Sequence, residues 1–142
     1  MMIRLITRQD LRTCAAIYAE AFAAPPYNDV WTPETAEEML SGLLDRDPYH
    51  CWLIEESNNI LGFAFCTTFG TFRGTVQEFA IAPAHQRRGL GTRLMDHILS
   101  EFQAEGIQNA DLIANQDAPA YRFYRQYGFN SPRRYVILAR PL

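Results

Sequence analysis

The chain has 142 residues, of which 48% are hydrophobic and 13% aromatic, and it carries a formal net charge of -3 at pH 7. This composition excludes a disordered chain, and no apolar run reaches the roughly 18 residues of a membrane span, so we expect no membrane partner. A net negative charge also argues against a nucleic-acid partner, which usually binds a basic patch. We expect one domain over residues 1–142 and, because no signal peptide is visible, a cytoplasmic location.

The first part of the chain alternates strand-like and helical patterns. Residues 2–6 predict a strand, and the capping-box spacing at 7–10 predicts a helix that continues to residue 22. Thr32 and Pro33 have the cap residue and first-turn proline of a second helix. The three cysteines of the chain lack metal-ligand spacing, so we expect buried thiols and no metal.

The middle of the chain predicts a meander followed by a βαβ unit. Residues 51–55, 60–69 and 75–82 are apolar runs separated by turn residues, which is typical of antiparallel strands. Apolar residues then repeat at helical spacing over 89–105, and residues 111–115 form another strand-like run. Strand, helix and strand would be joined by a crossover connection, which implies a parallel pair.

The end of the chain predicts a short helix over 119–127 and a last strand over 134–139. We interpret Tyr121 and Tyr127 as packing residues of this helix. An exposed strand edge at 134–139 makes a homodimer plausible.

The stretch between the third strand and the long helix has the chemistry of an anion site. Two glycines two residues apart allow close backbone approach, and the N–H groups of a helix N-terminus favour an anion. Arginine side chains add donors that suit phosphate oxygens, although a plain loop before a helix has the same composition. The stretch consists of Gln86, Arg87, Arg88, Gly89, Leu90, Gly91 and Thr92.

Three blocks together resemble the GCN5-related N-acetyltransferase (GNAT) superfamily. Residues 86–91 are similar to its Gln/Arg-x-x-Gly-x-Gly/Ala pyrophosphate loop, and residues 120–129 look like its Ala-x-x-x-Tyr-x-x-x-Gly-Phe signature. Residues 78–83 resemble its Glu-Leu-Ala-Val-x-Pro strand. The resemblance implies an α/β (α+β) fold with a mixed central sheet of six to seven strands, an antiparallel N-terminal meander, a βαβ unit and about four flanking helices.

The resemblance also implies transfer of an acetyl group from acetyl-CoA to an amine without a metal. The pyrophosphate contacts carry over to the backbone of residues 87–92, with the side chains of Gln86, Arg87 and Thr92 as candidates. The pantetheine would pair, like a missing strand, with the backbone of Phe79, Ala80 and Ile81. One N–H of Ala80 or Ile81 would stabilise the oxyanion.

Two side chains are candidates for the proton transfers. An ammonium group must lose a proton before it can attack, and Glu78 is the only acid between residues 57 and 95, within an otherwise apolar strand. It could instead face water or pair with Arg73. Tyr124 occupies the position that the family uses as general acid toward the departing CoA thiolate.

One position departs from the family. Asp117 stands three residues before the signature Ala120, where the family often has an asparagine that contacts the cofactor. Asn115, at the end of the preceding strand, is our candidate for that contact.

The acceptor side of the family is lined by the first two helices and their connection. Tyr27, Asp29 and Trp31 lie in that connection and are candidates for contact with the acceptor, as is Glu78. The aromatic pair could also simply join the helices. Two alternatives to a small-molecule acetyltransferase stay open: acetylation of a protein or peptide amine, and a non-catalytic acetyl-CoA sensor or interaction module. Residues 28–47 contain six acids against only Arg46, and such an acidic wall would attract a small cationic amine, although first turns of helices and solvated faces also carry acids. The six acids are Asp29, Glu34, Glu37, Glu38, Asp45 and Asp47.

Overall fold

The computed structural model describes residues 1–131 and 134–142. The described elements alternate in the order that the sequence predicts over most of the chain. The strands are β1 (Met2–Leu5), β2 (Cys51–Glu56), β3 (Asn59–Phe69), β4 (Arg73–Ile81) and β5 (Ala110–Leu112), and the helices are α1 (Leu11–Ala23), α2 (Pro33–Arg46), α3 (Leu90–Ala104) and α4 (Pro119–Gln126).

The strands form one mixed sheet with the order β1-β2-β3-β4-β5. Each of the first four strands pairs antiparallel with the next, and β4 pairs parallel with β5 across the α3 connection. The antiparallel meander and the βαβ unit are therefore confirmed, and the α/β class with them.

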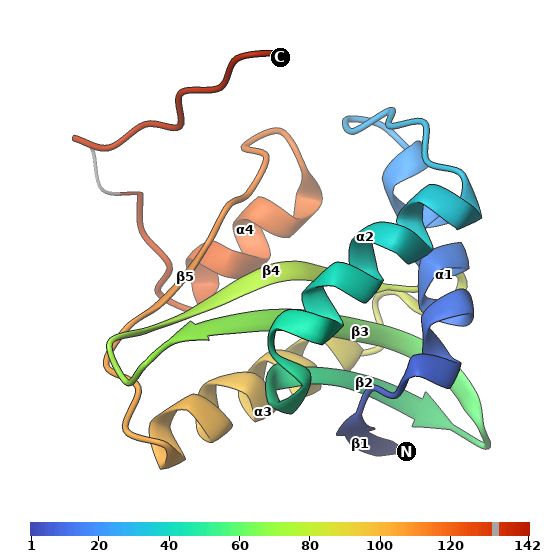
Figure 1. The fold of residues 1–142 in the computed structure, drawn as a ribbon, viewed down its shortest axis with the longest axis horizontal. Helices are drawn as coiled ribbons and strands as arrows, with labels where there is room; N and C mark the ends of the chain where they lie inside the picture. The colour runs from blue at the N-terminus through green and yellow to red at the C-terminus, as the bar shows by residue number, and fades with distance from the viewer. Residues whose placement is uncertain (132–133) are drawn as a thin grey trace.

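Helices cover both faces of the sheet (Figure 1). Successive strand residues point to opposite faces, so neighbours enter different cores. Leu53 and Phe63 belong to the core beneath α1 and α2, whereas Trp52 and Ala64 belong to the core beneath α3. The apolar faces predicted for the helices are thus buried against alternate residues of the same strands.

Local capping signals start the first two helices as predicted. Thr7 and Asp10 form a capping box before α1. The hydroxyl of Thr32 accepts a hydrogen bond from the Thr35 N–H at 3.1 Å, with Pro33 at the first position of α2. A cap of this kind needs only neighbouring residues, which is why the sequence predicts it well.

The predicted last strand is wrong. Residues 134–139 form no strand, and the sheet has five strands among the described residues rather than six to seven. Four consecutive side chains of this segment, Tyr135 to Leu138, are between 66% and 89% exposed. The segment runs apart from the sheet (Figure 1), and apolar composition cannot form a strand without hydrogen bonds to a neighbour. The homodimer expected through this segment stays a prediction.

The other strand boundaries shift by a few residues. The strand predicted at 111–115 is shorter and covers only Ala110–Leu112, and the one predicted at 75–82 begins earlier, at Arg73. Within the described ranges no helix is long and apolar enough to cross a membrane.

A buried histidine, His50, joins α2, β2 and α3 at the end of the sheet opposite residues 86–92, which we call the glycine loop. The Nδ1 of His50 lies 2.7 Å from Asp47 Oδ1, and its Nε2 lies 2.8 Å from Glu105 Oε2. The other Asp47 oxygen accepts from the Thr68 hydroxyl at 2.8 Å. Burial alone would lower the pKa of His50, but the two carboxylates outweigh it and raise the pKa. Both ring nitrogens can donate only when the imidazole is protonated.

We therefore predict that His50 stabilises the fold most at low pH. Because the pKa of His50 is raised in the folded state, its contribution is fully present below the unfolded pKa and is lost as the pH rises through the folded value. His50→Gln should lower the free energy of unfolding by about 1–3 kcal/mol near pH 5.5 and by less near pH 9. Urea unfolding of both proteins at the two pH values measures this; an equal difference at both would contradict it.

Candidate functional site

One edge of β4 is unpaired beyond the point where its pairing with β5 ends. Only Gly74, Thr75 and Val76 pair with β5, so the following residues of β4 have no strand on that side among the described residues. On its other side β4 follows β3, where Phe65 pairs with Glu78 and Cys66 with Val76. Gln77 is therefore an extra residue in β4, and a β-bulge of this kind bends the strand and redirects the next side chain. Glu78 follows the bulge directly.

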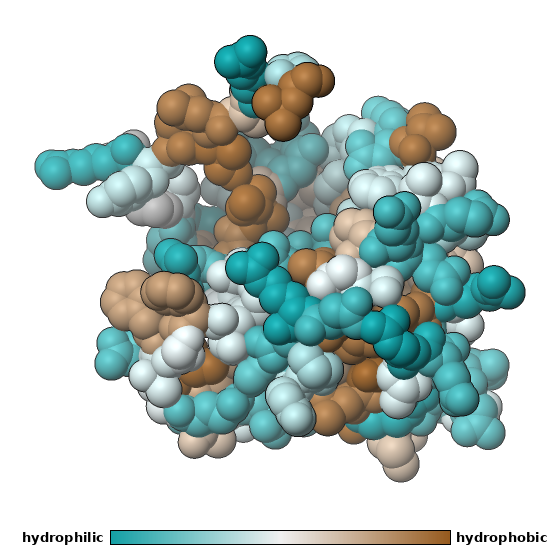
Figure 2. Space-filling view, in the orientation of Figure 1, coloured by the Kyte–Doolittle hydropathy of each residue, from teal (hydrophilic) through white to brown (hydrophobic). Residues whose placement is uncertain are grey.

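A cavity of about 540 Å³ lies along this open edge. The molecule is hollowed between its α4 side and its α1 and α2 side (Figure 2). The lining comes from the end of α1, from β4, from the start of α3, from the segment after β5 and from α4. The predicted site residues that line it are Tyr27, Glu78, Phe79, Ala80, Ile81, Gln86, Arg87, Gly89, Leu90, Gly91, Thr92, Asn115 and Tyr124.

The glycine loop lies at one end of the cavity and presents free backbone N–H donors there. Gly89 has φ +77° and caps α3, and Arg87 also adopts a positive φ of 63°. The first intrahelical bond runs from the Arg93 N–H to the Gly89 carbonyl at 3.1 Å. The N–H groups of residues 90–92 precede that bond and have no helical acceptor. This arrangement can hold an anion such as a diphosphate.

Two side chains of the loop are engaged within the protein. Gln86 Nε2 donates to the Ile81 carbonyl at 3.1 Å, which ties the loop to the end of β4. Arg88 contacts His85 at 3.1 Å and Glu56 at 3.4 Å, and it is not among the lining residues. Cofactor contacts of Arg88 would therefore use its backbone, as the loop motif implies.

Glu78 is a carboxylate in apolar surroundings. Burial raises its pKa to about 7, a hydrogen bond with Tyr18 opposes that shift, and the nearby charge of Asp29 adds to it. The alternative pairing with Arg73 does not form, because Arg73 pairs with Asp111 at 3.4 Å. A carboxylate that titrates near neutral pH can take up a proton at working pH.

Tyr124 faces the same cavity from α4. Its ring lies 6.1 Å from that of Phe79, 5.5 Å from Phe123 and 6.3 Å from Phe129. Burial raises its pKa, with smaller contributions from Tyr27 and Glu78. Because its pKa is raised, the hydroxyl is protonated at neutral pH. It makes no hydrogen bond to the part of the chain that the structure describes, so the O–H is available to donate.

The segment after β5 brings Asn115 to the cavity. Asn115 Oδ1 accepts a hydrogen bond from the Asp117 N–H at 2.9 Å, which leaves the Asn115 amide N–H₂ to donate. Asp117 itself is not among the lining residues. This geometry favours Asn115 over Asp117 as the cofactor contact, which stays a prediction.

The three predicted acceptor residues lie in different surroundings. Tyr27 lines the cavity, and its ring packs on Phe22 at 4.7 Å. Trp31 packs edge-on against Tyr18 at 5.3 Å and does not line the cavity, which matches the helix-joining alternative. Asp29 is also outside the lining, but its charge raises the pKa values of Glu78 and Tyr27.

The acidic residues around α2 do not form a continuous wall. Arg12 of α1 approaches Glu37 at 3.8 Å, and Arg8 pairs with Asp45. Asp47 is bound to His50 and Thr68 at the far end of the sheet. Half of the six acids are therefore engaged elsewhere, and Asp29 is the one whose charge acts on Glu78.

Sequence reasoning missed three aromatic residues of this site. Tyr18 and Phe22 are four residues apart on α1, with ring centroids 4.4 Å apart, and their helical spacing in the sequence indicates only an apolar helix face. Phe123 lines the cavity and stacks on Phe79 at 5.9 Å. The signal for Phe123 was its place beside Tyr124 in the signature block.

Other reactive groups lie away from the cavity. All three cysteines are buried, and burial raises the pKa of Cys14 and Cys51 to about 12. Over residues 1–131 and 134–142 no three His, Cys, Asp or Glu side chains gather in a way that could hold a metal ion.

The chain is similar to known N-acetyltransferases. The chain is 29% identical over 131 residues to an N-alpha-acetyltransferase RimI of Mycobacterium tuberculosis, covering 89% of this chain and 77% of the relative. It is 24% identical over 135 residues to a phosphinothricin N-acetyltransferase of Streptomyces viridochromogenes, covering 91% and 74%. Several other curated relatives align over only 70 to 76 residues, between 30% and 52% of their own length.

Solved structures share the fold. The PaiA N-acetyltransferase of Thermoplasma acidophilum in complex with coenzyme A superposes with a TM-score of 0.74 at 16% identity, over 89% of this chain and 87% of that one. The model of the acetyltransferase (GNAT) family matches residues 14–129. The chain belongs to the acetyltransferase (GNAT) family.

Proposed function

We propose that this protein transfers the acetyl group of acetyl-CoA to the primary amine of a small cationic molecule, by direct attack in a ternary complex. The observation that carries the proposal is the convergence of Glu78, Tyr124 and the open edge of β4 on one cavity that ends at the N-terminus of α3. Proton transfer at neutral pH can use a half-buried carboxylate of raised pKa and a tyrosine whose hydroxyl makes no hydrogen bond to the described residues.

The residues present fit the cofactor. Free N–H groups at the start of α3 suit a diphosphate, and the unpaired edge of β4 over residues 79–81 offers backbone groups to the amides of a pantetheine arm. Asn115 and the side chain of Thr92 would add donors along the same cavity. Acetyl-CoA would supply the acetyl group as a thioester.

The protein's own groups would handle two protons. Glu78 would accept the proton of the bound ammonium group, directly or through water, so that the amine nitrogen can bond to the carbonyl carbon. An N–H of Ala80 or Ile81 would donate to the carbonyl oxygen. Tyr124 would donate its hydroxyl proton to the sulfur as the carbon–sulfur bond breaks. The nitrogen, now bonded to the carbonyl carbon, would release its second proton through water to restore the Tyr124 hydroxyl, and Glu78 would return its proton to solvent. Much of the rate would come from holding amine and thioester together.

The acceptor side favours a cation. Glu78 lines the cavity and is influenced by the charge of Asp29, which lies outside the lining. Phe22 and Tyr27 also line the cavity, with their rings 4.7 Å apart. Carboxylates and aromatic faces both attract an ammonium group. Curated relatives named for N-alpha and ribosomal-protein alanine acetylation support a peptide amine as the second candidate.

The proposed activity is tested by release of free CoA thiol across a panel of amines. The panel should contain small diamines, amino sugars, amino acids and peptides with free N-termini. We expect turnover with a small cationic amine. Turnover with peptides alone would favour the second candidate, and CoA binding without thiol release for any amine would favour the sensor alternative.

We predict that Glu78→Gln lowers kcat by about 10²-fold or more, because the variant cannot accept a proton. Its Kd for acetyl-CoA should stay within about twofold, since the pyrophosphate and pantetheine contacts are made elsewhere. Steady-state kinetics and calorimetry check both values. Full activity on a good acceptor would remove Glu78 from the mechanism.

We predict a kcat/KM that falls as the pH drops through about 7, the pKa of Glu78. The base must be unprotonated to act, so acid removes the active form. Glu78→Gln should lose this limb of the pH profile. A limb near pH 7 that persists in the variant would assign it to another group.

Glu78→Gln should also stabilise the protein in the absence of substrates. The folded pKa of Glu78 lies above its unfolded value, so the carboxylate costs stability progressively as the pH rises from about 4.5 to about 7. We expect the variant to gain about 1–3 kcal/mol at pH 8 and little at pH 4.5. Denaturant unfolding at both pH values measures the gain, and a variant that is less stable at pH 8 would contradict it.

A further inference from the structure

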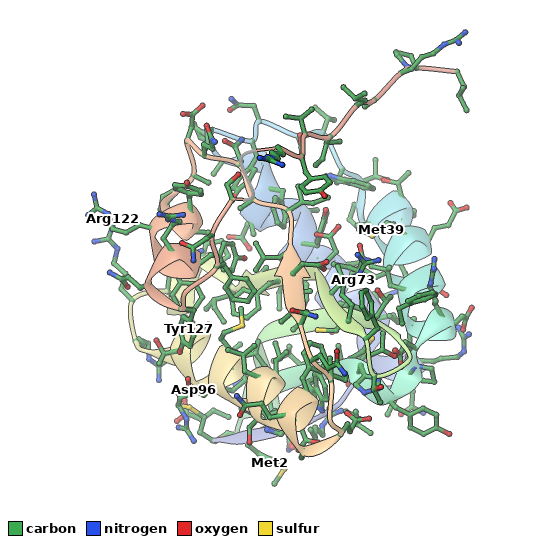
Figure 3. The ribbon with its side chains drawn as sticks, turned by 90° about the vertical axis from the view of Figure 1, so that its left-hand side faces the viewer. Met2, Met39, Arg73, Asp96, Arg122 and Tyr127 are labelled. Carbon is green, nitrogen blue, oxygen red and sulfur yellow. The ribbon has the colours of Figure 1, made fainter. Side chains whose placement is uncertain are left out.

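Tyr127 lies at the end of α4 and contacts α3 rather than the cavity. Its hydroxyl is 2.9 Å from Asp96 Oδ1 and 3.0 Å from the carbonyl of Thr92. Tyr127 and Asp96 lie side by side between the two helices (Figure 3). Both partners belong to the first two turns of α3, directly after the glycine loop. One hydroxyl proton is thus shared between two acceptors on the helix that forms the anion site.

The rest of α4 is held by aromatic packing. Its side chains are at most partly buried by exposed fraction, and Phe123 and Tyr124, which pack against the core beneath α3, also line the cavity. In the described chain, the Tyr127 hydroxyl provides the side-chain hydrogen bonds between the α4 end and α3. The ring of Tyr127 packs on that of Phe123 at 5.1 Å. Tyr127 therefore contacts α4 through its ring and α3 through its hydroxyl.

The spacing between α3 and α4 is narrow where the cofactor would lie. A Cβ added at Gly91 would be 3.6 Å from the Phe123 ring and 3.8 Å from the Phe79 ring. Gly91 and Thr92 line one side of the cavity, and Phe123 and Tyr124 line the other. A small displacement of α4 would therefore change the width of the cofactor site and the place of the Tyr124 hydroxyl together.

We propose that Tyr127 is a positioning residue for the acetyl-CoA site: its hydroxyl holds α4 at the distance from α3 that the cofactor requires. This role rests on the proposed use of acetyl-CoA. Tyr127 itself would touch neither the cofactor nor the acceptor. The role goes beyond packing, because a packing role needs only the ring.

The test is Tyr127→Phe, which keeps the ring and removes both hydrogen bonds. We expect its Kd for CoA, measured by calorimetry, to rise about three- to tenfold, the size of one partly exposed hydrogen bond to a carboxylate. The KM for acetyl-CoA should follow, and the KM for the acceptor should stay within about twofold. Tyr121→Phe is the matched control, because the Tyr121 hydroxyl makes no hydrogen bond to described residues; it should bind CoA as the wild type does.

Changes at Asp96 test the same contact from the other side. Asp96→Asn keeps an oxygen acceptor and should leave the Kd within about twofold, whereas Asp96→Ala should weaken CoA binding and add little to Tyr127→Phe in the double variant. Asp96→Ala carries the test if Tyr127→Phe does not fold. Unchanged CoA binding in Tyr127→Phe, or full additivity in the double variant, would overturn the role. A wild-type protein that binds no CoA would instead overturn the proposed function.

Discussion

The site depends on the open edge of β4. An interior strand normally satisfies its backbone groups on both sides, and leaving them unpaired costs free energy. Here β5 is only three residues long and pairs with β4 before the bulge at Gln77. Beyond that point, residues 78–81 expose donors and acceptors to a cavity instead of a strand. A ligand that carries amide groups can complete the sheet, and the N-terminus of α3 lies at the far end of the same edge.

The placement of Glu78 shows a conflict between stability and chemistry. Its carboxylate is half-buried, and burial raises its pKa to about 7. Above neutral pH the ionised carboxylate therefore lowers the free energy of unfolding. Tyr18 reduces the cost by hydrogen bonding, and Asp29 increases it. A polar but neutral side chain would suit the fold better. Residues that weaken a fold in this way are concentrated at functional sites.

Features that depend on near neighbours in sequence could be predicted. The caps at Thr32 and at Thr7, the glycine loop and the helical repeat of α3 need only local backbone chemistry. That Glu78 and Tyr124 belong to one site could be predicted only because separate blocks of the sequence resemble one family. Features set by distant partners could not be predicted. The segment 134–139 has strand composition without a paired neighbour, and Tyr18 meets Glu78 only when α1 packs on the sheet.

The same distinction governs the electrostatics of the acceptor side. In the sequence, six acids within residues 28–47 stand against one arginine, which suggests a strongly negative surface. The fold brings Arg8, which precedes α1, and Arg12 of α1 against two of them and His50 against a third. Of the six acids, Asp29 is the one whose charge acts on Glu78 in the cavity. Selection of a cation would rest on these two carboxylates and on the rings beside them, so the position of the α1–α2 connection, more than net charge, would decide which amines enter.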